Sequence, residues 1–438
     1  MIRITPFNAL APGEILTRDN RAEPSVSAAV DAILAGVRQK GDEALFAYAR
    51  QFDHAELIDL AVSEEEIEAA FAACEPEFLE TLRQAAANIR AFHAQQLHKD
   101  LLFTPRPGVV LGQRYTPLGR VGVYVPGGTA SYPSTVLMDV IPAQLAGVDE
   151  IVMATPPGQN GGVAPAILAA ARIAGVGRIF KMGGAQAVAA LAFGTQSVPR
   201  VDKIVGPGNI YVAEAKRKVY GLVDIDMIAG PSEILVLADG GADPAWVAAD
   251  LLSQAEHDKL ASAVLVTDSP ALASAVDAEL ERQLPLLPRA EIARASLAQN
   301  GRIVVADSLE KAVEAANLIA PEHLELCVED PFRLLGLVRN AGSIFMGRYA
   351  PEALGDYFAG PNHTLPTSGT ARFSSPLSVD DFVKKSSFTY YTAGALAAEA
   401  AQVAGFARRE GLEAHARSVE VRMQGPKTPD RLAEEVQP

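Results

Sequence analysis

The sequence predicts an α/β protein with two units, each built on a parallel β-sheet. Short β-rich runs alternate with helical segments from about residue 120, and a second series of the same kind begins near "AGPSE" at 229–233. Parallel strands need a crossover connection, commonly a helix, so this alternation is typical of βαβ units. The length of 438 residues also exceeds what one hydrophobic core usually serves, which favours several domains.

The segment before the first series has a helical pattern. Residues 25–98 carry apolar residues at helical spacing, and "SEEE" at 63–66 resembles an N-terminal capping segment. The predicted strands that follow are "RVGVYV" (120–125), "EIVMAT" (150–155), "RIFKM" (178–182) and "KIVG" (203–206). The predicted helices are "STVLMDVIPAQLAG" (134–147), "VAPAILAAARIAG" (163–175), "AQAVAALAFG" (185–194) and "NIYVAEAKRKVYG" (209–221).

The second series runs from about 233 to 328 and leads into a loop-rich region. Its predicted strands are "EILVLAD" (233–239), "SAVLVTD" (262–268), "RIVVAD" (302–307) and "LELCV" (324–328), with helices such as "PAWVAADLLSQAE" (244–256) and "LEKAVEAANLIA" (309–320). Residues 348–382 are rich in Gly, Pro, Ser and Thr. A long loop in a compact protein is usually functional or disordered, and the aromatics and His363 favour function. A small helical tail is predicted at roughly 392–424.

Composition limits the class of protein. The formal charge of −15 argues weakly against a nucleic-acid partner, because phosphate binding needs basic patches. The two cysteines, Cys74 and Cys327, can form neither a disulfide framework nor a thiolate zinc site. The first residues lack the features of a signal peptide, and no apolar run approaches the roughly 18–20 residues of a membrane span. These features predict a cytoplasmic protein that binds neither nucleic acid nor a membrane.

Glycine-rich turns indicate a possible nucleotide site. They are "VPGG" (125–128), "MGGAQ" (182–186), "VGPGN" (205–209) and "AGPS" (229–232). Helix N-termini at such turns offer free N–H groups to phosphate, and Tyr124, Gln186 and Asn209 lie where a dinucleotide would pass. No turn completes G-x-G-x-x-G, and turn glycines are often purely geometric. The alternative is therefore that these three polar residues only shape turns and cap helices.

Several histidines lie in polar contexts after residue 250. His257 follows Gln254 by three residues, so both face the same side of a helix, and His323 follows Glu322 where a strand begins. A carboxylate beside an imidazole at a strand end suits general base chemistry at neutral pH. A lone histidine is nevertheless more often a packing or surface residue than a ligand.

A metal site without cysteine pairs would use nitrogen and oxygen ligands, which suits Zn²⁺ or Mn²⁺. His363 and Asp356 share the long loop, and His415 follows Glu410 in the tail. Around His257, composition alone favours Glu256 or Asp258 over Gln254 as a ligand, because a neutral amide is a poor zinc ligand.

Taken together, these segments resemble the histidinol dehydrogenase family. The resemblance rests on "GRVGVYVPGGTASYPSTVLM", "MGGAQAVAALAFGT", "VDKIVGPGNIYVAEAKR", "IDMIAGPSEILVLAD", "DLLSQAEHD", "APEHLEL", "LGDYFAGPNHTLPT" and "EGLEAH". These stretches occur in the family's order and extend over roughly residues 20–424.

The resemblance implies oxidation of L-histidinol to L-histidine through L-histidinaldehyde with two NAD⁺, the final step of L-histidine biosynthesis. It implies one zinc ion per site, held by Gln254, His257, Asp356 and His415, and it thus selects Gln254 where composition favours Glu256 or Asp258. Glu322 and His323 correspond to the family's acid–base pair. The implied substrate contacts are Ser232, Gln254, His257, His323, Asp356, Glu410 and His415, and the implied NAD contacts are Tyr124, Gln186 and Asn209.

The resemblance also implies a homodimer whose C-terminal tail completes the neighbour's site, and two incomplete Rossmann-like domains. The expected divisions are an N-terminal arm (1–20), a first Rossmann-like domain with the N-terminal helices (21–122 plus 232–377), an NAD-binding domain (123–231) and a helical tail (378–438). One alternative is a related zinc- and NAD-dependent dehydrogenase of another polar alcohol, such as a sulfonated propanediol. An anionic substrate of that kind would favour basic residues in place of Glu410 and His415. The other alternative is a non-catalytic nucleotide- or metal-binding regulator.

Overall fold

The computed structural model describes residues 2–9, 18, 23–127 and 131–425. The chain divides into two compact units, the first made of Met1–Leu97 and Pro117–Phe382 and the second of His98–Thr116 and Val383–Pro438. Gly128 of the first glycine-rich turn, most of the N-terminal arm and the end of the tail lie outside the described residues.

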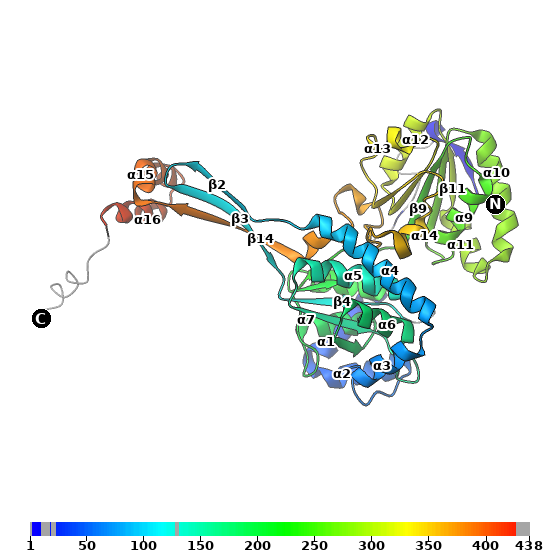
Figure 1. Cartoon of the computed structure of the whole chain (residues 1–438), viewed down its shortest axis with the longest axis horizontal. Helices are drawn as coiled ribbons and strands as arrows, with labels where there is room; N and C mark the ends of the chain where they lie inside the picture. Colours follow the sequence, from blue (N-terminus) through cyan, green and yellow to red (C-terminus); the bar gives the residue numbers. More distant parts are fainter. Residues whose placement is uncertain (1, 10–17, 19–22, 128–130, 426–438) are drawn as a thin grey trace, which may run out of the picture. The chain divides into compact units, whose positions relative to one another are not determined.

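A five-stranded parallel sheet forms one half of the first unit (Figure 1). Its strands, in spatial order, are β6 (Arg178–Lys181), β5 (Glu150–Thr155), β4 (Arg120–Tyr124), β7 (Lys203–Val205) and β8 (Asp224–Ile225). The helices that follow these strands are α5 (Pro133–Ala146), α6 (Pro165–Ala174), α7 (Gly184–Phe193) and α8 (Ile210–Val219). Alternate residues of each strand point to opposite faces, so helices must cover both faces of this apolar sheet.

The N-terminal helices complete that cover. They are α1 (Pro24–Lys40), α2 (Asp42–Tyr48), α3 (Glu64–Ala73) and α4 (Pro76–His93), with a π-helical turn at Ala49–Asp53 and a 3-10 turn at Ala94–Gln96. Helices α3 and α4 join the hydrophobic core formed by α5 and α6, while α1 and α2 join the core formed by α7 and α8. This packing differs from the expected grouping of 21–122 with 232–377, because the apolar pattern of a helix does not say which sheet it will cover. The domain bounds stay a prediction.

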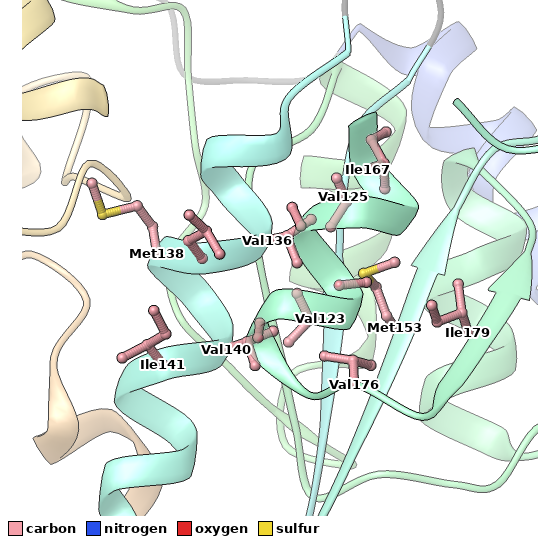
Figure 2. Packing of buried hydrophobic residues seen from close by; sticks show 14 of the residues in the cluster. Val123, Val125, Val136, Met138, Val140, Ile141, Met153, Ile167, Val176 and Ile179 are labelled. Atoms are coloured by element: carbon pink, nitrogen blue, oxygen red, sulfur yellow. The ribbon is translucent and has the colours of Figure 1, made fainter. Parts of the chain in front are cut away.

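The core under α5 shows how tightly this half is packed. Figure 2 shows Val136 and Val140 of α5 beside Val123 of β4 and Met153 of β5, and all four side chains are fully buried. Burial of one such side chain typically contributes about 1.5–3 kcal/mol.

A six-stranded sheet forms the other half of the first unit, and its strand pairs are also parallel. In spatial order the strands are β1 (Ile4–Pro6), β11 (Arg302–Val305), β10 (Ser262–Thr267), β9 (Glu233–Ala238), β12 (His323–Cys327) and β13 (Ser343–Met346). Helices α9 (Pro244–Ala255), α10 (Pro270–Gln283) and α11 (Ala290–Asn300) cover one face. The other face is covered by α12 (Leu309–Ile319) and α13 (Pro331–Leu335).

The strand order confirms the predicted fold class. When the strands are numbered along the chain from β4 in one sheet and from β9 in the other, both sheets read 3-2-1-4-5. This is the Rossmann order without its sixth strand. Strand β1 is an addition at the edge of the second sheet.

The loop-rich segment after β13 is more structured than its composition suggests. It contains the short helix α14 (Glu352–Leu354), a π-helical turn at Gly355–Ala359, and 3-10 turns at Thr370–Arg372 and Val379–Phe382. Further 3-10 turns lie at Phe7–Ala9 and Leu284–Leu286.

The second unit combines strands and helices. A three-stranded sheet is formed by β14 (Val383–Tyr391), β3 (Val109–Pro117) and β2 (Leu101–Arg106), and the predicted helical tail is α15 (Ala393–Arg409) with α16 (Glu413–Met423). The sequence pattern did not predict this sheet. Within the described ranges, no helix is both long and apolar enough to cross a membrane.

Candidate active site

Glu322 and His323 lie at the beginning of a central strand. Helix α12 ends at Ile319, Ala320 turns the chain in a left-handed conformation (φ 51°), and β12 starts at His323. Parallel pairing places His323 beside Ile234 of β9 on one side and Ser343 of β13 on the other. Both site residues are almost fully buried, at 6% exposure for Glu322 and 3% for His323.

The backbone of Glu233 fixes both side chains. Its N–H donates to Oε2 of Glu322 at 2.9 Å, and its carbonyl oxygen accepts from Nδ1 of His323 at 3.0 Å. Because Nδ1 carries the proton in that bond, Nε2 of the neutral ring holds the free lone pair. The imidazole is therefore oriented with Nε2 available to accept a proton.

Gln254 lies in the last turn of α9 and is 1% exposed. In the amide orientation that satisfies its neighbours, the oxygen accepts from Nδ1 of His323 at 3.2 Å and from the N–H of Glu233 at 3.1 Å, while the nitrogen donates to Oε1 of Glu352 at 2.9 Å. Gln254 thus connects the imidazole to a carboxylate that the sequence analysis did not identify.

Nε2 of His323 faces two carboxylates. Oδ1 of Asp356 lies 3.6 Å away and Oε1 of Glu352 lies 3.8 Å away. Nε2 is buried and makes no hydrogen bond with the residues that the structure describes. One ligand atom from each of His323, Glu352 and Asp356 lies within 4.8 Å of the others, a spacing that could hold a metal ion. Such a nitrogen and oxygen donor set is compatible with zinc.

Burial and charge shift the protonation of this cluster. Burial by itself would lower the pKa of His323. The carboxylates of Glu352, Glu322 and Asp356 outweigh that effect, so the pKa of the imidazole lies well above its usual value. Burial raises the pKa of Glu322 to about 8 and that of Glu352 to about 7. Burial also acts to raise the pKa of Asp356, but the close approach of the His323 ring and its charge lower it overall.

Two further histidines lie near Asp356. His257 follows the end of α9, and burial lowers its pKa although the charge of Asp356 acts in the opposite direction. His363 bonds through Nδ1 to the carbonyl oxygen of Asp356 at 3.0 Å, and its Nε2 lies 3.3 Å from the hydroxyl of Thr135. A cavity of about 160 Å³ lies beside Asp356 and His363. The structure thus brings Gln254, His257, Glu322, His323 and Asp356 into one region of the first unit.

The expected nucleotide contacts lie at the carboxyl ends of strands in the five-stranded sheet. Tyr124 ends β4, and its hydroxyl accepts from the N–H of Gly184 at 3.1 Å. Gln186 is buried in the first turn of α7. Asn209 caps α8 by accepting from the N–H groups of Tyr211 and Val212. These contacts agree with the capping alternative, and they also occur where a doubly wound sheet binds a dinucleotide.

The remaining expected residues have other positions. Ser232 directly precedes β9 and is half-buried. Glu410, at the end of α15, and His415, on α16, are exposed residues of the second unit. Asp258 accepts a hydrogen bond from the N–H of Leu260 and is exposed. Asp258 therefore shapes a turn, which fits the selection of Gln254 by the resemblance.

Sequence reasoning missed Glu352 and Glu233. Glu352 lies on a helix of three residues, where no periodic pattern marks its burial. Its N–H donates to Oε1 of the buried Glu325 at 2.7 Å. The signal that could have helped is the glutamate in "HLELC", since a carboxylate inside an apolar strand needs a buried partner.

Nearly the whole chain is similar to proteins of one family. Residues 16–423 match the family described as histidinol dehydrogenase. The histidinol dehydrogenase of Bacillus subtilis (strain 168) is 56% identical over 393 residues, which cover 90% of this chain and 92% of the relative. The histidinol dehydrogenase of Geobacter sulfurreducens is 55% identical over 426 residues, covering 96% of this chain and 99% of the relative.

A solved structure gives the same result at the level of the fold. The crystal structure of histidinol dehydrogenase from Elizabethkingia anophelis superposes with a TM-score of 0.92 at 41% identity, covering 96% of this chain and 97% of that one. The matches extend over nearly the whole chain and confirm the resemblance inferred from the sequence. The chain therefore belongs to the histidinol dehydrogenase family.

Proposed function

We propose that this protein oxidises L-histidinol to L-histidine through L-histidinaldehyde, reducing two NAD⁺ in succession at the final step of L-histidine biosynthesis. Family membership supports the substrate and the reaction. The observation that carries the proposal in this chain is the buried Glu322–His323 pair, in which Nδ1 is held by a carbonyl and Nε2 is left free. The absence of thiolate pairs and the family membership support a cytoplasmic location.

His323 acts as the general base of the proposed reaction. Its Nε2 accepts the proton of the substrate hydroxyl, while the carbonyl oxygen of Glu233 keeps Nδ1 protonated and the ring in place. Glu322 accepts a proton from the water that attacks the aldehyde. His323 then serves again as base when the hydrate is oxidised. Tyr124, Gln186 and Asn209 would hold NAD⁺, which would supply the hydride acceptor for each oxidation.

Zinc would be held by Gln254, His257 and Asp356, together with His415 of a second copy. A zinc ion held there would supply orientation of the substrate. Ser232, Gln254, His257, His323, Asp356, Glu410 and His415 would contact the substrate, with Glu410 near one of its cationic groups. The carboxylates around Nε2 of His323 support a cation at this place. When a cation binds beside these carboxylates, the side-chain amide of Gln254 can rotate. Its oxygen, rather than its N–H, then faces the cation.

A homodimer with shared sites is part of the proposal. The hydrophobic cluster of the second unit consists of three alanines, Ala404, Ala407 and Ala416. Large apolar side chains of this unit are exposed, among them Leu101, Leu102, Phe103, Phe388, Tyr390 and Phe406. An exposed set of this kind favours a protein interface, and the exposed Glu410 and His415 are available to a second copy.

The stoichiometry of NADH formation tests the function. With L-histidinol as the substrate, we expect two NADH per L-histidine formed, measured by absorbance and amino-acid analysis. A sulfonated propanediol assayed in parallel should give no NADH. One NADH per product, or faster oxidation of the sulfonated diol, would contradict the proposal.

Removal of either base should lower turnover. His323→Asn and Glu322→Gln should each reduce kcat by roughly 10²–10⁴-fold, because proton transfer loses its acceptor. Asp258→Asn is the matched acid-to-amide control and should retain normal turnover, since Asp258 only accepts a bond within a turn. Near-normal turnover in both site variants would refute the assignment.

Metal removal tests the zinc site. Dialysis against a chelator should abolish NADH formation, and added zinc should restore it. Asp356→Asn should reduce the bound zinc measured by mass spectrometry, whatever its effect on activity. Indifference of the native enzyme to chelation would remove zinc from the mechanism.

Mixing two inactive variants tests the sharing of sites. In a 1:1 mixture of His323→Asn and His415→Asn chains, half of the dimers are mixed and each mixed dimer has one intact site. Activity should then recover to about a quarter of the native value after subunit exchange. A mixture that stays inactive after proven exchange would mean that each chain supplies its own His415.

A further inference from the structure

Arg18 connects the N-terminal arm to the base of the candidate active site. Its Nε donates to Oε1 of Glu233 at 2.6 Å, and its Nη2 donates to Oε2 of the same carboxylate at 2.6 Å. Its Nη1 donates to the carbonyl oxygen of Ile319 at 2.7 Å. The pair is largely buried, with side-chain exposures of 17% for Arg18 and 6% for Glu233.

The geometry of these bonds requires an arginine. A planar guanidinium can bond both oxygens of one carboxylate and still direct a third N–H elsewhere, whereas a lysine ammonium acts as a point charge. Gly369 leaves room for the group, because a Cβ at this position would lie 2.8 Å from Nη1 of Arg18. Its φ of +77° also suits glycine. The surroundings are thus shaped to hold this side chain in one orientation.

Both hydrogen-bond partners of Arg18 are closely connected to the proposed catalytic pair. Glu233 is the first residue of β9, and its N–H and carbonyl oxygen hold the side chains of Glu322 and His323. Ile319 is the last residue of α12, three residues before Glu322. Arg18 therefore connects the start of β9 to the turn between α12 and the neighbouring strand β12.

We propose that Arg18 is a positioning residue for the Glu322–His323 pair, acting through Glu233 and Ile319. This inference rests on the proposed function, because it takes Glu322 and His323 as the catalytic residues. Among the described residues, Arg18 makes its hydrogen bonds to Glu233 and Ile319 and not to Glu322 or His323, so it acts on the backbone that orients them. A displacement of that backbone by a fraction of an ångström changes where Nε2 of His323 points.

Arg18→Lys is the informative variant, because it keeps the positive charge beside Glu233 but loses the bidentate hydrogen bonding to the carboxylate. We expect kcat to fall by about 10- to 100-fold, a loss typical of misplaced catalytic groups. The KM for NAD⁺ should stay within about 2-fold, since the proposed NAD⁺ contacts Tyr124, Gln186 and Asn209 belong to the half built on the five-stranded sheet. A purely structural role would lower stability without this separation of kcat from KM.

Arg372→Lys is the matched control. Arg372 donates through Nη2 to the carbonyl oxygen of Leu318, so it serves the same helix end without contacting Glu233. Its kcat should stay within about 2-fold of the native value, because no hydrogen bond of the described residues leads from Leu318 to the catalytic pair. An equal loss in both arginine variants would assign the effect to the end of α12 and overturn the inference.

Glu233→Gln gives a second measurement if Arg18→Lys does not fold. It retains the side-chain shape and the backbone groups of residue 233 but weakens the contact with Arg18, so the same selective fall in kcat is expected. His323→Asn is assayed alongside. If His323→Asn is inactive while every folded variant of Arg18 or Glu233 keeps normal kcat, the inference is wrong and the proposed function stands. If His323→Asn turns over normally, the proposed function fails first.

Discussion

The candidate active site depends on two hydrogen bonds from the backbone of one residue. The N–H and carbonyl oxygen of Glu233 orient Glu322 and His323, respectively. These bonds are possible because β9 and β12 are adjacent parallel strands, which bring residues 89 and 90 positions apart into contact. The central place of both strands also keeps the pair away from water, so the register of the sheet sets the orientation of the imidazole.

The two sheets place their polar residues at opposite ends. In the five-stranded sheet, Tyr124 and Asn209 follow the carboxyl ends of β4 and β7, as expected for a dinucleotide site. In the six-stranded sheet, Glu233 and His323 begin their strands. The loop after β13 reaches α5 through Asn362, whose side-chain amide donates to the carbonyl oxygen of Met138. The segment that carries Asp356 therefore also contacts the half of the first unit built on the five-stranded sheet.

The fold was predictable wherever burial leaves a periodic pattern. The strands and helices from 120 to 328 alternate clearly because both faces of each sheet are covered, so the strands read as apolar runs. The three-stranded sheet of the second unit has no such signal: β2 is exposed along its whole length. Its residues gain little burial within this chain, and composition alone therefore cannot distinguish them from loop.

Prediction of the site had a similar limit. Helical spacing suggested that Gln254 and His257 face the same side of a helix, but His257 lies just after the end of α9, and their pairing stays a prediction. The adjacent Glu322 and His323 were visible as a pair. Glu352 was not visible, because its role depends on contacts with Gln254 and Glu325 that only the folded chain creates. Arg18 was not visible either. It is a single arginine in a segment without a periodic pattern, and its partner Glu233 lies 215 positions away in the sequence. Residues whose importance comes from one long-range contact leave no local trace.

The charges of the cluster give it a chemical preference. Glu322, Glu352 and Asp356 surround one imidazole in a buried space. Holding several negative charges together without water around them costs free energy. This cost raises the pKa values of Glu322 and Glu352. The same carboxylates stabilise a positive charge on the ring, which raises the pKa of His323. A divalent metal or a substrate ammonium would be stabilised in the same way. Binding such a cation removes the electrostatic reason for the ring to remain protonated, and a neutral ring with a free Nε2 is the form that can accept a proton from an alcohol.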